Sequence, residues 1–162
     1  MALALQVFPP GGRTMPEKET IKRARRDKRQ GKSPSTQAGE FVREEIHHVR
    51  EGKHGARSTK QAIAIGLSKA RRSGVKLGTP RKAKSATKRS AQSARRRAGK
   101  RASPRRSRAV RRTLKHESRS VASRKALSRQ ARAAARKRGR TARKAAARKA
   151  VATRRRRQNA SA

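Results

Sequence analysis

The chain has 162 residues, of which 51 are Lys or Arg and only 8 are Asp or Glu, so its formal net charge is +43. It contains no Cys, Trp or Tyr and only two Phe, which excludes disulfide frameworks, Cys-based metal sites and a hydrophobic core of ordinary size. Such a composition is typical of a chain that is disordered over much of its length and needs a polyanionic partner.

Residues 1–15 are expected to form a disordered N-terminal extension. The apolar run from Met1 to Phe8 is short, has no basic segment before it and runs into two prolines, so it does not fit a secretory signal. No stretch approaches the roughly 20 apolar residues of a membrane span. We therefore predict a cytoplasmic protein without a membrane partner, and Met1 and Met15 both stay open as the start of translation.

A short basic helix is predicted over residues 16–30, in a segment that runs to residue 32. It begins with acidic residues and ends in basic ones, an order that suits the helix dipole, and Gly31 follows at the position that glycine favours. Its only apolar residues are Ile21 and Ala24. The helix therefore has almost nothing to bury.

A helical hairpin is predicted over residues 33–77, which makes the ordered part all-α. Its first helix, over residues 34–51, follows a capping Ser33 and carries apolar residues spaced three and four apart, the period of one buried face. Its second helix, over residues 59–73, follows Ser58 in a capping-box pattern and ends before a glycine. The side chains expected to pack the hairpin are Phe41, Val42, Ile46, Val49, Ile63, Ile65 and Leu67.

The hairpin is small for an independent domain. Domains of about 40 residues rarely hold together without a metal, a disulfide or a partner. We therefore expect the hairpin to form a homo-oligomer or to dock on one protein partner.

Two sequence blocks in residues 15–77 carry a family resemblance. They are FVREEI over residues 41–46 and KQAIAIGLSKARR over residues 60–72. With them the segment resembles a family of small bacterial proteins that share a domain of unknown function. The resemblance implies a bacterial origin and a helical hairpin, but no activity; members of that family often carry a basic tail and are loosely labelled DNA-binding.

Residues 78–162 are predicted to be a low-complexity basic tail, either disordered or a nascent Ala/Arg-rich helix. From residue 81 onward the chain has 33 Lys or Arg and a single acid. Ala, Arg and Lys favour helix, whereas like charges three and four residues apart oppose it. We therefore expect helix to form when phosphate groups neutralise the repulsion.

The tail resembles those of linker histones and bacterial histone-like proteins in composition. Two tetrapeptides, TPRK over residues 79–82 and SPRR over residues 103–106, match the linker-histone pattern of Ser/Thr-Pro followed by two basic residues. In that family the pattern is associated with the minor groove of A/T-rich DNA, where inserted Arg is favoured. Chance is the alternative reading, because most residues near a proline in this tail are basic or hydroxylated.

Sequence-nonspecific binding to duplex DNA is the function that these features favour. Each Lys or Arg that neutralises a phosphate releases counterions, whereas the chain lacks the Cys of zinc fingers and the aromatic platform that binds single strands. We predict a histone-like, nucleoid-associated protein that neutralises and compacts DNA. The residues expected to contact DNA are Arg81, Lys82, Arg95, Arg96, Arg97, Arg105, Arg106, Arg111, Arg112, Arg136, Lys137, Arg138, Arg143, Lys144, Arg154, Arg155, Arg156 and Arg157.

Two other functions stay open. An RNA- or ribosome-associated protein would have the same basic tail, and a partner-binding hairpin could use the tail only for localisation. Competition between RNA and duplex DNA separates the first of these from DNA binding.

Catalysis and metal binding are not expected. Glu44 and His48, and likewise His47 and Glu51, are four residues apart, a spacing at which helical side chains can share a metal. We interpret both pairs, and Glu45 beside them, as solvated groups on a helix face. The two remaining histidines, His54 and His116, stand in basic loops and are expected to be inert, so we predict no cofactor, no metal site and no enzyme.

Overall fold

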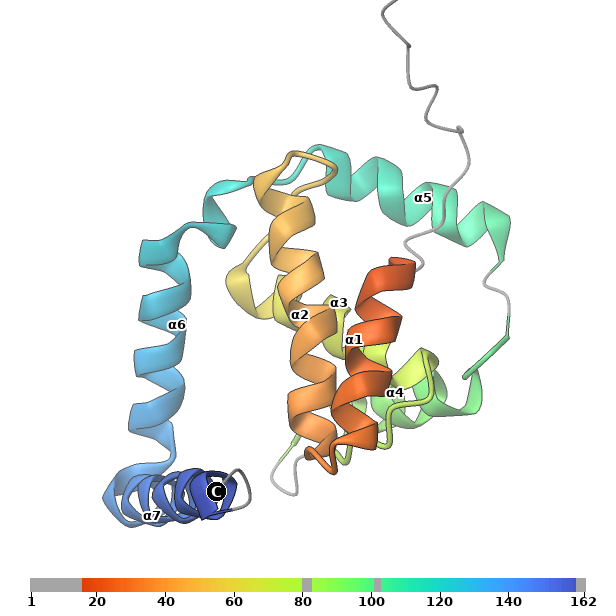
Figure 1. Ribbon diagram of the computed structural model, residues 1–162. Coiled ribbons are helices and arrows are strands. Elements are labelled where there is room, and N and C mark those ends of the chain that lie inside the picture. Colours follow the sequence, from red (N-terminus) through yellow and green to blue (C-terminus); the bar gives the residue numbers. More distant parts are fainter. Residues whose placement is uncertain (1–15, 80–82, 101–102, 160–162) are drawn as a thin grey trace, which may run out of the picture. The chain divides into compact units, whose positions relative to one another are not determined.

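The computed structural model describes residues 16–79, 83–100 and 103–159, and the regular elements of these residues are all helices (Figure 1). The predicted all-α fold class is therefore confirmed. The elements are α1 (Lys18–Arg29), α2 (Pro34–Arg50), α3 (Thr59–Arg72), α4 (Ser85–Arg96), α5 (Pro104–Lys115), the 3₁₀ turn η1 (Ser120–Ala122), α6 (Arg124–Lys137) and α7 (Gly139–Asn159).

The described chain forms two compact units that are divided after Ala122. The first contains α1 to η1, and the second contains α6 and α7. None of the described helices is long and apolar enough to cross a membrane. The predicted extension over residues 1–15 lies outside the described residues.

The N-termini of α2 and α3 are capped as the sequence predicts. The Ser33 hydroxyl accepts a hydrogen bond from the Thr36 amide at 3.4 Å, and the Ser58 hydroxyl accepts one from the Gln61 amide at 3.2 Å. The reciprocal bond of a capping box is shifted by one residue, because the Gln61 side chain accepts from the Arg57 amide at 2.7 Å. Left-handed glycines follow α1, α2 and α3, namely Gly31, Gly52 and Gly74.

The core lies where α1, α2 and α3 meet. α2 packs against both other helices, as Figure 1 shows for this unit. Phe41 and Val49 are fully buried, and Ile46 is nearly so. The other predicted packing residues are half-buried: they are Val42, Ile63, Ile65 and Leu67. The predicted hairpin is thus observed, and small residues make up much of its core.

Gly66 explains how closely α2 and α3 approach each other. A Cβ atom at this position would lie 2.6 Å from the Cα of Val42, and thus inside the backbone of the facing helix. Only glycine fits this crossing without moving a helix.

The expectation that the first helix has almost nothing to bury is wrong. Thr20 is fully buried and Ala24 nearly so against the hairpin, and the Arg23 guanidinium donates to Glu40 on α2 at 2.7 Å. Asp27, also buried, accepts from Lys32 at 2.6 Å. A small face and polar contacts therefore hold α1 in the same core.

The segment after α5 returns to the loop between α2 and α3. The amides of Gly55 and Ala56 donate to the carbonyls of Leu114 at 2.8 Å and of Ser118 at 3.1 Å. Nearby, the Arg50 guanidinium donates to the Ala122 carbonyl at 2.8 Å. The predicted tail boundary at residue 78 therefore differs from the structure, in which the first compact unit continues to Ala122.

The returning segment covers apolar surface of the hairpin that was expected to need a partner. Residues of the same chain cover the hairpin, and the exposed large hydrophobic side chains of the described residues are Val110 and Val151, both outside it. Self-association stays a prediction, but the described hairpin leaves no large apolar side chain exposed.

The second unit consists of two helices, α6 and α7. The sequence predicted that this segment is either disordered or a nascent helix. α6 begins at a capping Ser123, whose hydroxyl accepts from the Ala126 amide at 3.2 Å. Gly139, with a φ of 76°, separates α6 from α7. The helix preference of Ala and Arg accounts for both helices, although α6 has no buried residue and the described side chains of α7 are exposed.

Candidate nucleic-acid interface and a buried polar cluster

A straight cationic stripe runs along α6. Lys125, Arg129, Arg132 and Arg136 follow one another at intervals of four, three and four residues, so they share one helix face. They line a common groove with Ser128 and are all exposed. The stripe is about 16 Å long at 1.5 Å per residue. It can therefore contact several successive phosphates of one strand.

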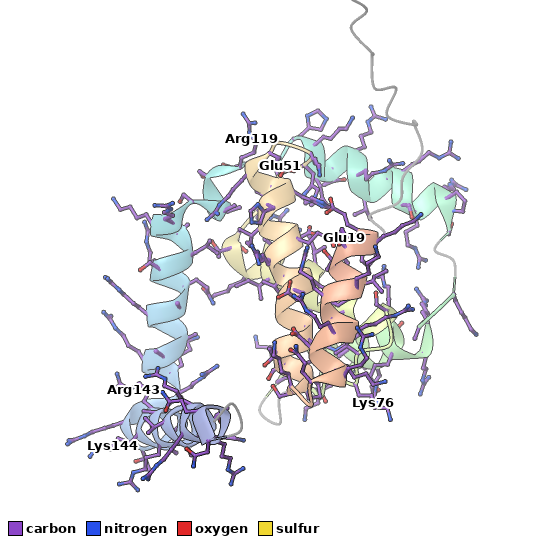
Figure 2. The ribbon with its side chains drawn as sticks, viewed as in Figure 1. Glu19, Glu51, Lys76, Arg119, Arg143 and Lys144 are labelled. Atoms are coloured by element: carbon purple, nitrogen blue, oxygen red, sulfur yellow. The ribbon has the colours of Figure 1, made fainter. Side chains whose placement is uncertain are left out.

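α7 carries positive charge around its circumference. Arg143 and Lys144 project from adjacent positions of the helix (Figure 2), and the Arg143 guanidinium also donates to the Gly139 carbonyl at 3.3 Å. Residues 123–162 contain 16 Lys or Arg and no acid. This charge is unmatched within its own segment of the chain.

The first unit adds cations on α4 and α5. α4 buries Ala91 and Ala94 and leaves Arg95 exposed at its end. The positive charge of Arg95 also affects the buried guanidinium of Arg71. Burial lowers the pKa of Arg71, and the charge of Arg95 lowers it further. The Nε of Arg71 has no hydrogen-bond partner. An anion between Arg71 and Arg95 would reduce this repulsion.

Most of the predicted DNA-contacting residues are exposed on helices or directly at their ends. Arg111 is half-buried and has an interaction within the chain, whereas Arg81, Lys82 and the side chain of Arg157 lie outside the described part of the structure. The exposed ones are Arg95, Arg96, Arg97, Arg105, Arg106, Arg112, Arg136, Lys137, Arg138, Arg143, Lys144, Arg154, Arg155 and Arg156. They lie on or directly after four helices, α4 to α7, rather than in one pocket.

A buried polar cluster lies between α2, α3 and the loop that joins them. Lys69 on α3 approaches two carboxylates of α2, Glu45 at 2.7 Å and Glu44 at 3.2 Å. All three side chains are almost completely buried. Glu44 also accepts from the Glu17 amide at 3.0 Å, which links the start of α1 to the cluster.

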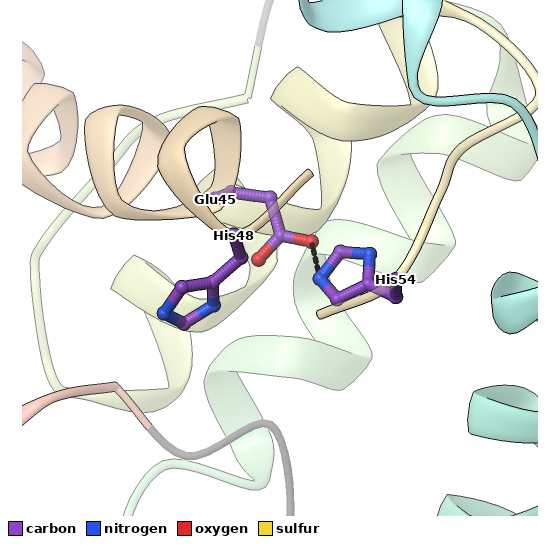
Figure 3. Close-up of side chains that lie close together, drawn as sticks. All are labelled: Glu45, His48 and His54. Atoms are coloured by element: carbon purple, nitrogen blue, oxygen red, sulfur yellow. Dashed lines mark ion pairs between the residues drawn. The ribbon is translucent and has the colours of Figure 1, made fainter. Parts of the chain in front are cut away.

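Two histidines flank the Glu45 carboxylate (Figure 3). His54 Nε2 is 3.2 Å from Glu45 Oε1, and the His54 side chain is 6% exposed. The His48 ring stands edge-on to the His54 ring at a centroid distance of 6.2 Å. Neither oxygen of Glu45 nor His54 Nε2 forms a hydrogen bond of acceptable geometry, although the charged groups are close.

The interpretation of Glu44, Glu45 and His48 as solvated groups was wrong, whereas the expectation that His54 and His116 are inert stays a prediction. Glu44, Glu45 and His54 are buried, and His48 is largely so, whereas His47 and Glu51 are exposed as expected. His116 is exposed as well. The position of Glu45 along α2 could have predicted its burial. Glu45 lies four residues after Phe41 and four before Val49, and both of these lie on the buried face of the helix.

Outside the buried cluster, a chain of ion pairs reaches solvent. Glu17 Oε1 lies 2.9 Å from His48 Nε2 and 3.3 Å from Lys53 Nζ. The hydrogen bond from His48 is the main reason that the pKa of Glu17 is lowered, and Lys53 adds to it. Hydrogen bonds to Glu51 and Glu17 raise the pKa of Lys53 in turn.

Residues 17–83 match the model of a family of unknown function (DUF6496). This match agrees with the resemblance of residues 15–77 to a domain of unknown function, and it covers α1 to α3 of the structure. No curated protein and no solved structure shows significant similarity to the chain.

Proposed function

We propose that this protein is a histone-like, sequence-nonspecific DNA-binding protein that neutralises and compacts duplex DNA. The observation that supports this most directly is the second unit: its described helices expose basic side chains and have no buried core. Like charges three and four residues apart destabilise such helices. A phosphate backbone removes this repulsion and is the partner that fits them.

Binding occurs through the DNA backbone rather than through base edges. The exposed cations are spread over α4 to α7, and each one that neutralises a phosphate releases condensed counterions. Arg predominates among them, and its planar guanidinium can hold a phosphate with two hydrogen bonds. Several separate basic helices on one chain allow contacts to more than one duplex segment, which compacts DNA.

A charge-removal experiment tests this proposal. In the full-length chain, Lys125, Arg129, Arg132 and Arg136 are changed together to Gln, which removes the α6 stripe. If all four contact phosphates, the log–log salt slope of duplex binding falls in magnitude by about 3.6, at about 0.9 per contact.

The matched control removes four exposed cations from the first unit. Lys18, Arg25, Arg26 and Arg29 are all exposed on α1, and their change to Gln alters the net charge equally. We expect this control to reduce the slope clearly less than the α6 variant does. Equal slopes for both variants would contradict a defined role for α6 and leave only the effect of net charge.

RNA is the alternative that the same experiment must separate. At matched phosphate concentration, we expect transfer RNA to compete less well than duplex DNA. Displacement from DNA by a small fraction of RNA would refute the proposed DNA partner.

A further inference from the structure

We propose that Glu45, His48 and His54 form a binding site for one divalent transition-metal ion, with zinc as the ion that suits them best. Each residue offers one ligand atom, and these atoms lie within 4.8 Å of one another. The inference is independent of DNA binding, because none of the three residues is among those proposed to contact DNA.

The donor set and its spacing fit zinc. One carboxylate and two imidazoles are ligands that Zn²⁺ accepts, with a fourth position for water. Two ligands at 2.0–2.1 Å from a tetrahedral ion lie about 3.3 Å apart, and Glu45 Oε1 is 3.2 Å from His54 Nε2. Both atoms lack a proper hydrogen bond, as expected of groups whose partner is an ion.

Each histidine already has the outer contact that orients a metal ligand. His54 Nδ1 is 2.9 Å from the Gly55 carbonyl, and His48 Nε2 is 2.9 Å from the Glu17 carboxylate. Metal-binding histidines almost always donate their second N–H to a carbonyl or a carboxylate in this way. These contacts leave His54 Nε2 and His48 Nδ1 as the atoms free to bind, and Figure 3 shows both rings beside the Glu45 carboxylate.

The local charge favours a cation in an otherwise strongly positive chain. The contacts around the site join four carboxylates, those of Glu17, Glu44, Glu45 and Glu51, to the ammonium groups of Lys53 and Lys69. With the histidines neutral, these four carboxylates still outnumber the two ammonium groups and the Arg43 guanidinium, which also lines the pocket beside His48. Half of all the acids of the chain gather here, so a cation meets less repulsion here than elsewhere on the chain.

Lys69 does not block the site. Its ammonium group lies 2.7 Å from Oε2 of Glu45 and shares its charge with Glu44. Oε1 is then the oxygen available to the ion, while Oε2 keeps its ion pair with Lys69. His48, one of the three proposed ligands, also lines a surface pocket of about 220 Å³.

A bound ion would fasten the loop after α2. His48 is on α2 and His54 is in the loop, next to the Gly55 amide that binds the returning chain at Leu114. The metal would therefore hold together the place where residues 114–122 meet the hairpin.

Cobalt titration of the full-length protein, after removal of metals with a chelator, tests the site. Co²⁺ reports tetrahedral nitrogen and oxygen ligands by intense visible absorption bands. We expect one Co²⁺ per chain, bleaching of the bands by one equivalent of Zn²⁺, and a higher unfolding temperature with Zn²⁺. His54→Gln should abolish the bands, whereas His47→Gln, which changes an exposed neighbour of His48, should keep them.

Glu17→Gln tests the site without changing a ligand. It replaces the outer partner of His48 and should weaken Co²⁺ binding 10–100-fold. If His54→Gln fails to fold, the Co²⁺ affinity of Glu17→Gln tests the site in its place. The proposal is overturned if the wild-type chain shows no tetrahedral bands, or if His54→Gln retains them. Unchanged affinity in Glu17→Gln would overturn it equally.

Discussion

Replacing Gly66 by alanine should destabilise the first unit, although the same change stabilises most helices. A Cβ atom there would lie 2.6 Å from the Cα of Val42 and 3.0 Å from its amide nitrogen. Carbon atoms in contact are normally 3.5–4.0 Å apart, so α2 and α3 must separate by about 1 Å. Overpacking of this kind costs about 1–3 kcal/mol.

Gly39 provides the matched control. It lies on α2, is exposed, and a Cβ atom there would meet nothing within 4 Å. Gly39→Ala should therefore gain up to about 1 kcal/mol from helix propensity alone. The propensity gain is common to both variants, so the difference between them isolates the steric cost, about 1–3 kcal/mol.

Urea unfolding followed by circular dichroism at 222 nm measures this difference, because the chain has no Trp or Tyr for fluorescence and urea carries no charge to mask electrostatics. We expect the midpoint of Gly66→Ala to fall below that of Gly39→Ala. A Gly66→Ala protein as stable as Gly39→Ala would refute the close packing of α2 on α3.

Three further predictions concern the rest of the chain. Gly55→Ala would drive a Cβ atom into the Glu117 carbonyl, so the segment over residues 114–122 should detach and become sensitive to limited proteolysis; resistance equal to that of the wild-type protein would contradict the observed return. Lys69→Met leaves two buried carboxylates without their ammonium partner and should cost about 3–5 kcal/mol in urea unfolding, whereas Lys60→Met, at an exposed position of the same helix, should cost little. Saturating duplex DNA should increase the helical circular dichroism of the full chain, because neutralised charges no longer oppose α6 and α7; an unchanged spectrum would exclude coupled folding.

Local sequence signals were sufficient to place the first three helices. Ser33 and Ser58 cap their helices through the hydrogen bonds that their side chains were expected to accept, and Gly52 and Gly74 take the left-handed conformation expected after a helix. These features depend on a few neighbouring residues, so they can be read from the sequence.

Long-range contacts could not be placed in the same way. Nothing in the local pattern of residues 114–122 shows that their carbonyls receive the amides of Gly55 and Ala56. The burial of Glu45 and Lys69 could have been anticipated, since both occupy positions on the buried faces of their helices. Opposite charges at facing core positions indicate a buried ion pair rather than two solvated residues.

Charge and helix propensity predicted a cationic segment that is either disordered or a nascent helix. Composition alone indicated a polyanionic partner, whereas the alignment of Arg129 and Arg132 in one stripe requires that the segment be helical. Helix propensity favours these helices, and charge repulsion opposes them.

The salt dependence of duplex binding by the full-length protein tests the central claim most directly. An affinity that depends on counterion release falls linearly on a log–log plot, and about ten phosphate contacts give a slope near −9. We predict a slope at least this steep, equal for duplexes of unrelated sequence. A shallow slope, or an affinity that depends strongly on sequence, would contradict the account of a nonspecific electrostatic DNA-binding protein.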